Sequence, residues 1–258
     1  MKKFPTAALV TALLALSFGT PAQAETSAPS TSTSSAHATL APSTPAGSGR
    51  IIAGNRSYTE NVVHVRFTQD NEDFECSGSL IDPNWVLTAR HCADPAEGIT
   101  NIQVATGTTK EFPGNAQRIK KAHISSRGDV ALLELSTPIR GITPVTLSGN
   151  YTPRAGDTGT IVGYGLRANK EYSNYQYKAQ NRVISSSRDL YNGPAIYLEG
   201  INGAANHGDS GGPLIINNQV VGVCSKGDSD DPGADPNETV YYANLSAHRS
   251  WIKSISGI

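Results

Sequence analysis

A series of short β-type segments restricts the fold of this chain more than any other feature. Segments rich in Val, Ile, Leu, Tyr and Thr alternate with clusters of Gly, Pro, Asn and Asp from residue 51 to about residue 243. Short runs of this kind, bounded by turn residues, are typical of strands. Only residues 245–255 place apolar side chains at helical spacing. The pattern predicts an all-β fold with strands at 62–67, 78–81, 85–89, 102–106, 118–124, 130–135, 158–163, 177–185, 195–198, 213–216, 220–225 and 239–243.

A glycine-rich segment, 208–214, has the sequence Gly-Asp-Ser-Gly-Gly-Pro-Leu and presents Ser210 on a tight turn. Such a serine is a candidate nucleophile. Its hydroxyl is weak at neutral pH unless a histidine base and a third, orienting group lie nearby. His91, which precedes Cys92, and Asp129, which opens an apolar run, are the candidates for these two roles.

These motifs, in the order His, Asp, Ser, resemble those of the trypsin-like (chymotrypsin-fold) serine peptidases. Three motifs in one order are much harder to produce by chance than a single motif, and other triad folds use other orders. The serine motif also fits the nucleophile elbow of α/β-hydrolases, but an elbow needs a helix after the serine, and residues 214–216 have the pattern of a strand. The resemblance implies a catalytic triad of His91, Asp129 and Ser210.

The resemblance also implies two packed six-stranded antiparallel β-barrels with a C-terminal helix. The expected limits are about 51–140 for the first barrel, about 150–243 for the second and about 245–256 for the closing helix. Pro and Gly residues keep residues 135–151 irregular, as expected of a boundary. Together these parts make residues 51–258 the expected peptidase domain.

Further site residues follow from the same resemblance. The backbone N–H groups of Gly208 and Ser210 would form the oxyanion hole, and Ser225 would hydrogen-bond the triad aspartate. Cys76 and Cys92 would form a disulfide, which leaves Cys224 as a buried, inert thiol in an apolar run. No cofactor is implied, and no metal site is expected.

The specificity pocket departs from that of trypsins. Ala204 stands where trypsins carry a specificity aspartate, and Val240 stands where they have a pocket-lining glycine. We therefore expect a small or medium apolar residue on the acyl side of the substrate. Asn206 replaces a cysteine of many relatives, so we expect residues 228–233 to be a free, acidic and mobile loop at the pocket rim. The pocket residues implied by the resemblance are Ala204, Ala205, Ser225, Lys226, Gly227 and Val240.

The first fifty residues differ from the rest of the chain. Two lysines, an apolar stretch at 7–18 and the small residues at 22–24 predict a signal peptide over 1–24 and a secreted, extracellular protein. Residues 25–50 are mostly Ser, Thr, Ala, Pro and Gly, which predicts a disordered pro-segment or linker.

The junction between this segment and the β-rich region resembles the activation site of the family. Cleavage after Arg50 would free an Ile51 ammonium, which would pair with Asp209 and convert a zymogen to the active enzyme. A constitutively active enzyme with an incidental Arg50 is the alternative.

Charge and composition exclude some partners. Without Lys2, Lys3, Arg50 and Glu25, residues 51–258 hold 18 Lys and Arg against 21 Asp and Glu, so no nucleic-acid binding is expected. No later segment is long enough to span a membrane. We expect a monomer that binds a polypeptide substrate, a processing protease and protein inhibitors. A secreted endopeptidase and an esterase with the same triad both fit the sequence.

Overall fold

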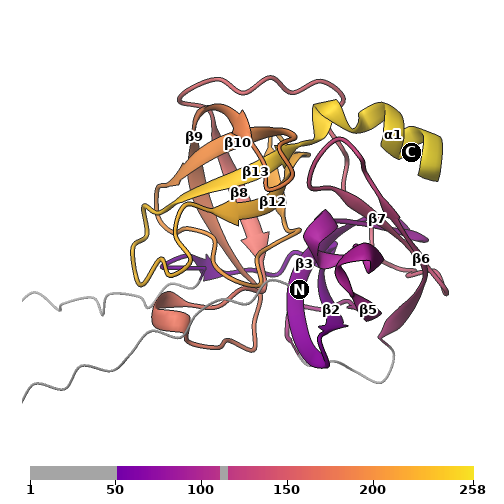
Figure 1. Ribbon diagram of the computed structural model, residues 1–258. Helices are drawn as coiled ribbons and strands as arrows, with labels where there is room; N and C mark the ends of the chain where they lie inside the picture. Colours follow the sequence, from indigo (N-terminus) through magenta and orange to yellow (C-terminus); the bar gives the residue numbers. More distant parts are fainter. Residues whose placement is uncertain (1–50, 111–115) are drawn as a thin grey trace, which may run out of the picture. The chain divides into compact units, whose positions relative to one another are not determined.

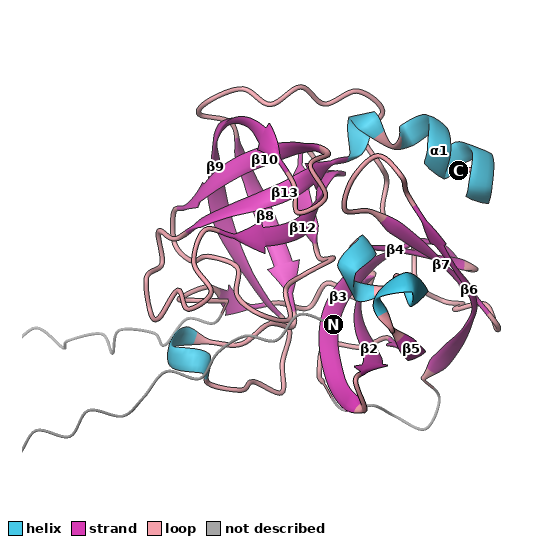
Figure 2. Cartoon of the chain, viewed as in Figure 1, coloured by secondary structure: helices cyan, strands magenta, loops and turns pink. Residues whose placement is uncertain are grey.

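The computed structural model describes residues 51–110 and 116–258, which form a mostly β fold of two barrels with one C-terminal helix (Figures 1 and 2). The expected fold class is confirmed. The predicted signal peptide, pro-segment and Arg50 lie outside the described residues. Within the described residues, no helix is both long and apolar enough to cross a membrane.

The first barrel is a closed antiparallel sheet in the order β2-β3-β4-β7-β6-β5. Four of the six pairings join strands that follow one another in the sequence, and the other two join β2 to β5 and β4 to β7. The six strands are β2 (Val62–Gln69), β3 (Glu72–Asp82), β4 (Trp85–Thr88), β5 (Thr100–Ala105), β6 (Gln117–Ile124) and β7 (Ala131–Leu135).

The second barrel follows the order β9-β10-β13-β12-β11-β8 and closes through the pairing of β8 with β9. A short strand, β1 (Asn55–Arg56), extends this sheet by pairing with the start of β9 and was not predicted. The six barrel strands are β8 (Thr158–Gly163), β9 (Tyr177–Arg188), β10 (Pro194–Gly200), β11 (Pro213–Ile216), β12 (Gln219–Gly227) and β13 (Thr239–Asn244).

Side-chain alternation explains where each strand lies. In β9, buried Tyr177 and Ala179 alternate with exposed Lys178 and Gln180, as expected for a strand with one solvated face. In β2, by contrast, four successive residues from Val62 are buried. Val62 packs with side chains of the second barrel, so β2 is covered on both faces where the barrels meet.

The C-terminal helix begins later than predicted. Leu245–Ala247 is a 3₁₀ turn capped by the Asn244 side chain, which accepts a hydrogen bond from the N–H of Ser246. Helix α1 (Arg249–Ser256) then follows, after His248 at φ −110°. The buried His248 ring lies 2.9 Å from the Ser125 hydroxyl, which fixes the chain between the turn and the helix.

One disulfide joins β3 to the 3₁₀ turn Arg90–Cys92. The Cys76 and Cys92 sulfurs are bonded, as the resemblance implied, and both residues are buried in the first barrel's core. The crosslink therefore fixes the turn that carries His91 to the barrel wall.

Replacing both bridged cysteines with alanine should lower the free energy of unfolding by roughly 3 kcal/mol, because the open chain gains entropy in the unfolded state. Urea unfolding of the Cys76→Ala/Cys92→Ala variant measures this loss. Cys224→Ala, which truncates a buried thiol without a bridge, is the matched control. Because the variant truncates two cysteines and the control truncates one, a loss of unfolding free energy no greater than twice that of Cys224→Ala would contradict the prediction.

Candidate active site

His91 and Asp129 form a hydrogen-bonded pair at the edge of the first barrel. Nδ1 of His91 lies 2.8 Å from Oδ2 of Asp129, and the backbone N–H of His91 donates to Oδ1 at 3.0 Å. An ionised carboxylate can only accept, so the ring proton resides on Nδ1. This tautomer leaves Nε2 with a lone pair that can accept a proton.

Asp129 is fully buried, yet its carboxylate is well satisfied. Besides the two bonds from His91, it accepts one from the Ser225 hydroxyl at 2.6 Å. Ser225 lies on β12 of the second barrel, and its own oxygen accepts the N–H of Leu190 at 3.1 Å. The resemblance implied that Ser225 would hydrogen-bond the triad aspartate, and the structure contains this bond.

The serine segment is held against the first barrel by β3. The N–H of Ser77 donates to the carbonyl of Ser210 at 2.7 Å, and the Ser77 hydroxyl donates to the carbonyl of Gly208 at 2.9 Å. Gly211 has φ +80°, and a Cβ there would lie 2.2 Å from the hydroxyl of Thr88. Only glycine allows this close approach of the two barrels next to Ser210.

In two peptide groups of this segment, the carbonyl accepts a backbone hydrogen bond, and this fixes the direction of the N–H group on the same peptide. The carbonyl of His207 accepts the N–H of Leu166 at 2.7 Å, and the carbonyl of Asp209 accepts that of Gly212 at 2.9 Å. In a trans peptide the N–H points opposite to the carbonyl. The N–H groups of Gly208 and Ser210 therefore point away from these anchors, and neither donates a hydrogen bond within the described part of the chain.

A single pocket contains the candidate base and nucleophile. His91 and Ser210 both line it, together with five of the six predicted specificity residues. The sixth, Ala204, is fully buried, donates its N–H to the carbonyl of Ile52 and does not line the pocket, which corrects its assignment as a pocket residue. The other lining residues are Ala205, Asn206, His207, Cys224, Ser225, Lys226, Gly227, Ser229, Asp230, Pro232, Glu238 and Val240.

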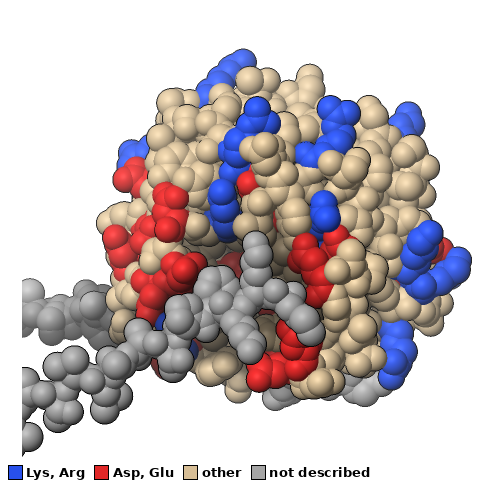
Figure 3. Space-filling model, in the orientation of Figure 1, with Lys and Arg blue, Asp and Glu red and all other residues tan. Residues whose placement is uncertain are grey.

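Acidic side chains contribute to the rim of this pocket. Asp230 and Glu238 lie in its lining, and Figure 3 shows carboxylates gathered around the middle of the face in view. The ammonium of Lys226, also in the lining, lies 4.7 Å from the centre of the Tyr241 ring. The pocket thus combines an apolar wall at Val240 with a polar entrance.

The loop at the pocket rim is tethered, which corrects the expectation of a free, mobile loop. Nε2 of His207 lies 2.9 Å from the carbonyl of Asp230, and Lys170 forms an ion pair with Asp231 at 2.9 Å. The N–H of Asn169 also donates to the carbonyl of Gly233 at 2.7 Å. These bonds connect residues 230–233 to His207 and to the turn Ala168–Lys170, without the disulfide that many relatives have.

Asp209, next to the serine, is buried without an ion-pair partner among the described residues. Its carboxylate accepts the N–H of Gly165 at 2.8 Å and that of Asn206 at 2.9 Å. Burial raises the pKa of Asp209 to about 6, although both backbone donors favour the charged form. A nearby cation would lower the energy of this carboxylate.

Among the described residues, one cluster of potential metal-ligand atoms was found, and its chemistry does not suit a metal. The ligand atoms of Cys76, His91 and Cys92 lie within 4.8 Å of one another. The two sulfurs are bonded to each other, so neither is a thiolate. The remaining cysteine, Cys224, is buried, and burial raises the pKa of its thiol, as expected for an inert residue.

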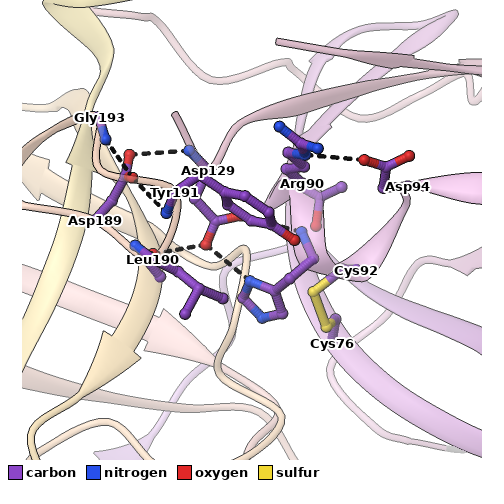
Figure 4. Close-up of polar contacts among 12 residues, drawn as sticks. Cys76, Arg90, Cys92, Asp94, Asp129, Asp189, Leu190, Tyr191 and Gly193 are labelled. Carbon is purple, nitrogen blue, oxygen red and sulfur yellow. Dashed lines mark hydrogen bonds and ion pairs between the residues drawn. A yellow bond between two sulfur atoms is a disulfide. The ribbon is translucent and has the colours of Figure 1, made fainter. Parts of the chain in front are cut away.

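One turn of the second barrel that contacts Asp129 was not predicted from the sequence. Residues 189–193 connect β9 to β10, and Figure 4 shows Asp189 and Tyr191 beside Asp129. The pair Asn192-Gly193 is a common turn signal. However, no feature of the turn sequence indicates that Asp189 contacts Asp129, which lies 60 positions before it in the chain.

Comparisons with known proteins found a matching family model and similar relatives. A family model described as Trypsin matches residues 51–252. An uncharacterized peptidase of Corynebacterium glutamicum is 30% identical over 239 residues, which cover 90% of this chain and 78% of that protein. Trypsin 5G1 of Aedes aegypti is 30% identical over 236 residues, 82% of this chain and 86% of that protein.

Solved structures show the same fold. A structure described as HL collagenase matches with a TM-score of 0.67 and 23% identity, and the match covers 80% of this chain and 98% of that chain. The matched family model and the two relatives extend this likeness from the fold to the family. The chain therefore belongs to the trypsin family of serine peptidases, which are hydrolases.

Proposed function

We propose that the protein is a secreted endopeptidase that cleaves polypeptides through an acyl-enzyme, with Ser210 as nucleophile, His91 as base and Asp129 as the orienting group. The observation that carries this proposal is the hydrogen bond between His91 and Asp129, together with the pocket that His91 and Ser210 both line. The buried carboxylate holds the tautomer in which Nε2 can accept the serine proton.

Each step then has a group to perform it. Ser210 Oγ attacks the scissile carbonyl while its proton passes to Nε2 of His91, and the resulting imidazolium is stabilised by Asp129. The N–H groups of Gly208 and Ser210 stabilise the oxyanion, and each such donor typically contributes about 3 kcal/mol. His91 gives its proton to the leaving amine, and water then releases the acyl group by the same sequence.

The pocket supports a small or medium apolar residue on the acyl side of the scissile bond. Val240 and Ala205 give it an apolar wall, while the carboxylates of Asp230 and Glu238 belong to its rim. Esters are chemically easier substrates for the same acyl-enzyme, so an esterase is the alternative that substrate measurements must separate.

Replacing Ser210 with alanine should abolish hydrolysis of both peptides and matched esters, with a loss in kcat of about 10⁴- to 10⁶-fold. A panel of peptides that vary at the acyl-side residue, assayed beside esters of the same residues, measures this. The exposed Ser185→Ala on β9 is the control and should keep full activity. A Ser210 variant that cleaves peptides at a rate close to that of the unmodified protein would contradict the assignment, whereas an unmodified protein that cleaves only esters would favour the esterase.

We further propose that the protein is exported and made as a zymogen that is cut after Arg50. Formation of the Cys76–Cys92 disulfide suits an oxidising compartment. Ile51 is buried in the same apolar cluster as Cys224, and the charge of Asp209 acts on that thiol. Asp209 is itself buried and has no ion-pair partner among the described residues, so an ammonium freed at Ile51 would supply a charge that this carboxylate lacks.

The proposed switch predicts that the stability of the uncut chain falls as the pH rises and that cutting removes this fall. Because the folded pKa of Asp209 in the uncut chain is raised above its ordinary value of 3.8, its favourable contribution is complete below that value and is lost as the pH rises through about 6. Pairing with the Ile51 ammonium removes this loss. Cutting should therefore stabilise the protein at pH 7.5 relative to pH 4 by about 3 kcal/mol, which corresponds to the shift in pKa.

Urea unfolding of the chain before and after cleavage at Arg50, at both pH values, measures this difference, with activity assayed on the same samples. Asp209→Asn is the control and should remove the pH-dependent gain. An Arg50→Gln chain with full activity, or a cut chain with no gain at pH 7.5, would favour a constitutively active enzyme.

A further inference from the structure

The turn between β9 and β10 contains a buried carboxylate that bonds only to backbone. Asp189 is 2% exposed. Its Oδ1 accepts the N–H groups of Tyr191 at 2.9 Å and Gly193 at 2.8 Å, and its Oδ2 accepts the N–H of Asp129 at 2.9 Å (Figure 4). A carboxylate of the second barrel thus holds the backbone of an aspartate of the first.

Two glycines make this contact possible. A Cβ on Gly128 would lie 2.3 Å from Oδ2 of Asp189, and one on Gly193 would lie 2.6 Å from the same atom. The turn is also closed on itself, because Asp189 donates its N–H to the carbonyl of Gly193 at 2.9 Å. Asp189 therefore has little freedom to move away from Asp129.

The same turn contacts the site by two further routes. The N–H of Leu190 donates to Ser225, whose hydroxyl donates to the carboxylate of Asp129. The guanidinium of Arg90, next to His91, lies 4.1 Å from the centre of the Tyr191 ring. The turn thus reaches Asp129 from its backbone side and from its carboxylate side.

We propose that Asp189 is a positioning residue for the His91–Asp129 pair, which it supports by fixing the backbone of Asp129 and by placing a second buried carboxylate against the residue whose own carboxylate contacts the His91 ring. This inference rests on the proposed catalytic roles of His91 and Asp129. An anion near the imidazolium favours its charged form, which develops during each proton transfer.

The charge of Asp189 can favour the imidazolium only if neighbouring cations do not offset it. The titratable groups near the turn are Asp129, Arg127, His248, Tyr191, Arg188, Arg90 and Glu97. Burial lowers the pKa of His248 to about 4, so its ring is neutral in the pH range where serine peptidases lose activity on acidification. The charge of Asp189 is thus not cancelled by a protonated His248 in that range.

The isosteric variant Asp189→Asn removes the charge and places an amide donor against a backbone N–H, so at least one bond is lost. We expect kcat per active site to fall about tenfold or more, with KM unchanged within about twofold. The acid limb of the kcat/KM profile should move to lower pH, because the imidazolium loses a stabilising charge. The low-field proton resonance of His91 Nδ1–H should move upfield, a signal that needs no turnover.

Asp157→Asn is the matched control, since that carboxylate accepts a bond from the Tyr151 hydroxyl rather than from groups of the site. Gly193→Ala is a second variant that keeps the charge but pushes on the carbonyl oxygen of Arg127, on Cα of Gly128 and on Oδ2 of Asp189, and so displaces the turn from the backbone before Asp129. It should lower kcat without moving the acid limb, and it tests the positioning effect if Asp189→Asn does not fold.

Asp129→Asn separates failure of this inference from failure of the proposed function. If Asp129→Asn lowers kcat while a folded Asp189→Asn keeps the kcat, acid limb and proton resonance of the unmodified protein, Asp189 has no positioning role. A lower melting temperature with unchanged kcat per active site would likewise reduce Asp189 to a structural residue. If Asp129→Asn keeps its activity, the triad itself is wrongly assigned.

Discussion

The buried carboxylate of Asp129 is the constraint on which the rest of the structure depends. A fully buried charge is costly unless donors surround it, and these donors come from both barrels. His91 approaches from the first barrel and Ser225 from the second. The aspartate is therefore stable only where the two barrels meet, which explains why residues far apart in sequence share one pocket.

Strand β3 completes this junction on the side of the nucleophile. Ser77 donates its N–H to the carbonyl of Ser210 and its hydroxyl to that of Gly208, while Cys76 bonds to Cys92 beside His91. One strand thus fixes both the turn of the base and the segment of the serine. Substitutions that alter the packing between the two barrels should consequently lower catalytic activity more than they disturb the core of either barrel.

The sequence predicted the parts of the molecule whose signals are local. Strand positions, the disulfide and the three motifs each depend on residue type and spacing within a short window or on a family pattern. The helix start was displaced to Arg249 because Asn244 caps a 3₁₀ turn and the buried His248 ring contacts Ser125, a residue of the first barrel's half. Such a contact has no local signature.

Long-range contacts also account for the features that were missed or wrong at the site. The acidic rim loop is held by Lys170 and His207, and neither pairing can be read from charge alone. In the sequence, Asp189 cannot be distinguished from an ordinary turn residue. Its hydrogen bond to the N–H of Asp129 depends on the close packing of Gly128 against its carboxylate, which is seen only in the folded structure. Specific partners across a barrel interface become visible only when the fold is known.

The most direct test of the central claim is to react the protein with a fluorophosphonate and map the adduct by mass spectrometry over a range of pH. If the barrel interface assembles His91, Asp129 and Ser210 into one nucleophilic unit, a single adduct should form on Ser210. Its rate should fall as the solution is acidified, and the reaction should be lost in His91→Ala. An adduct on another serine, or a rate on Ser210 that depends on neither pH nor His91, would contradict the account.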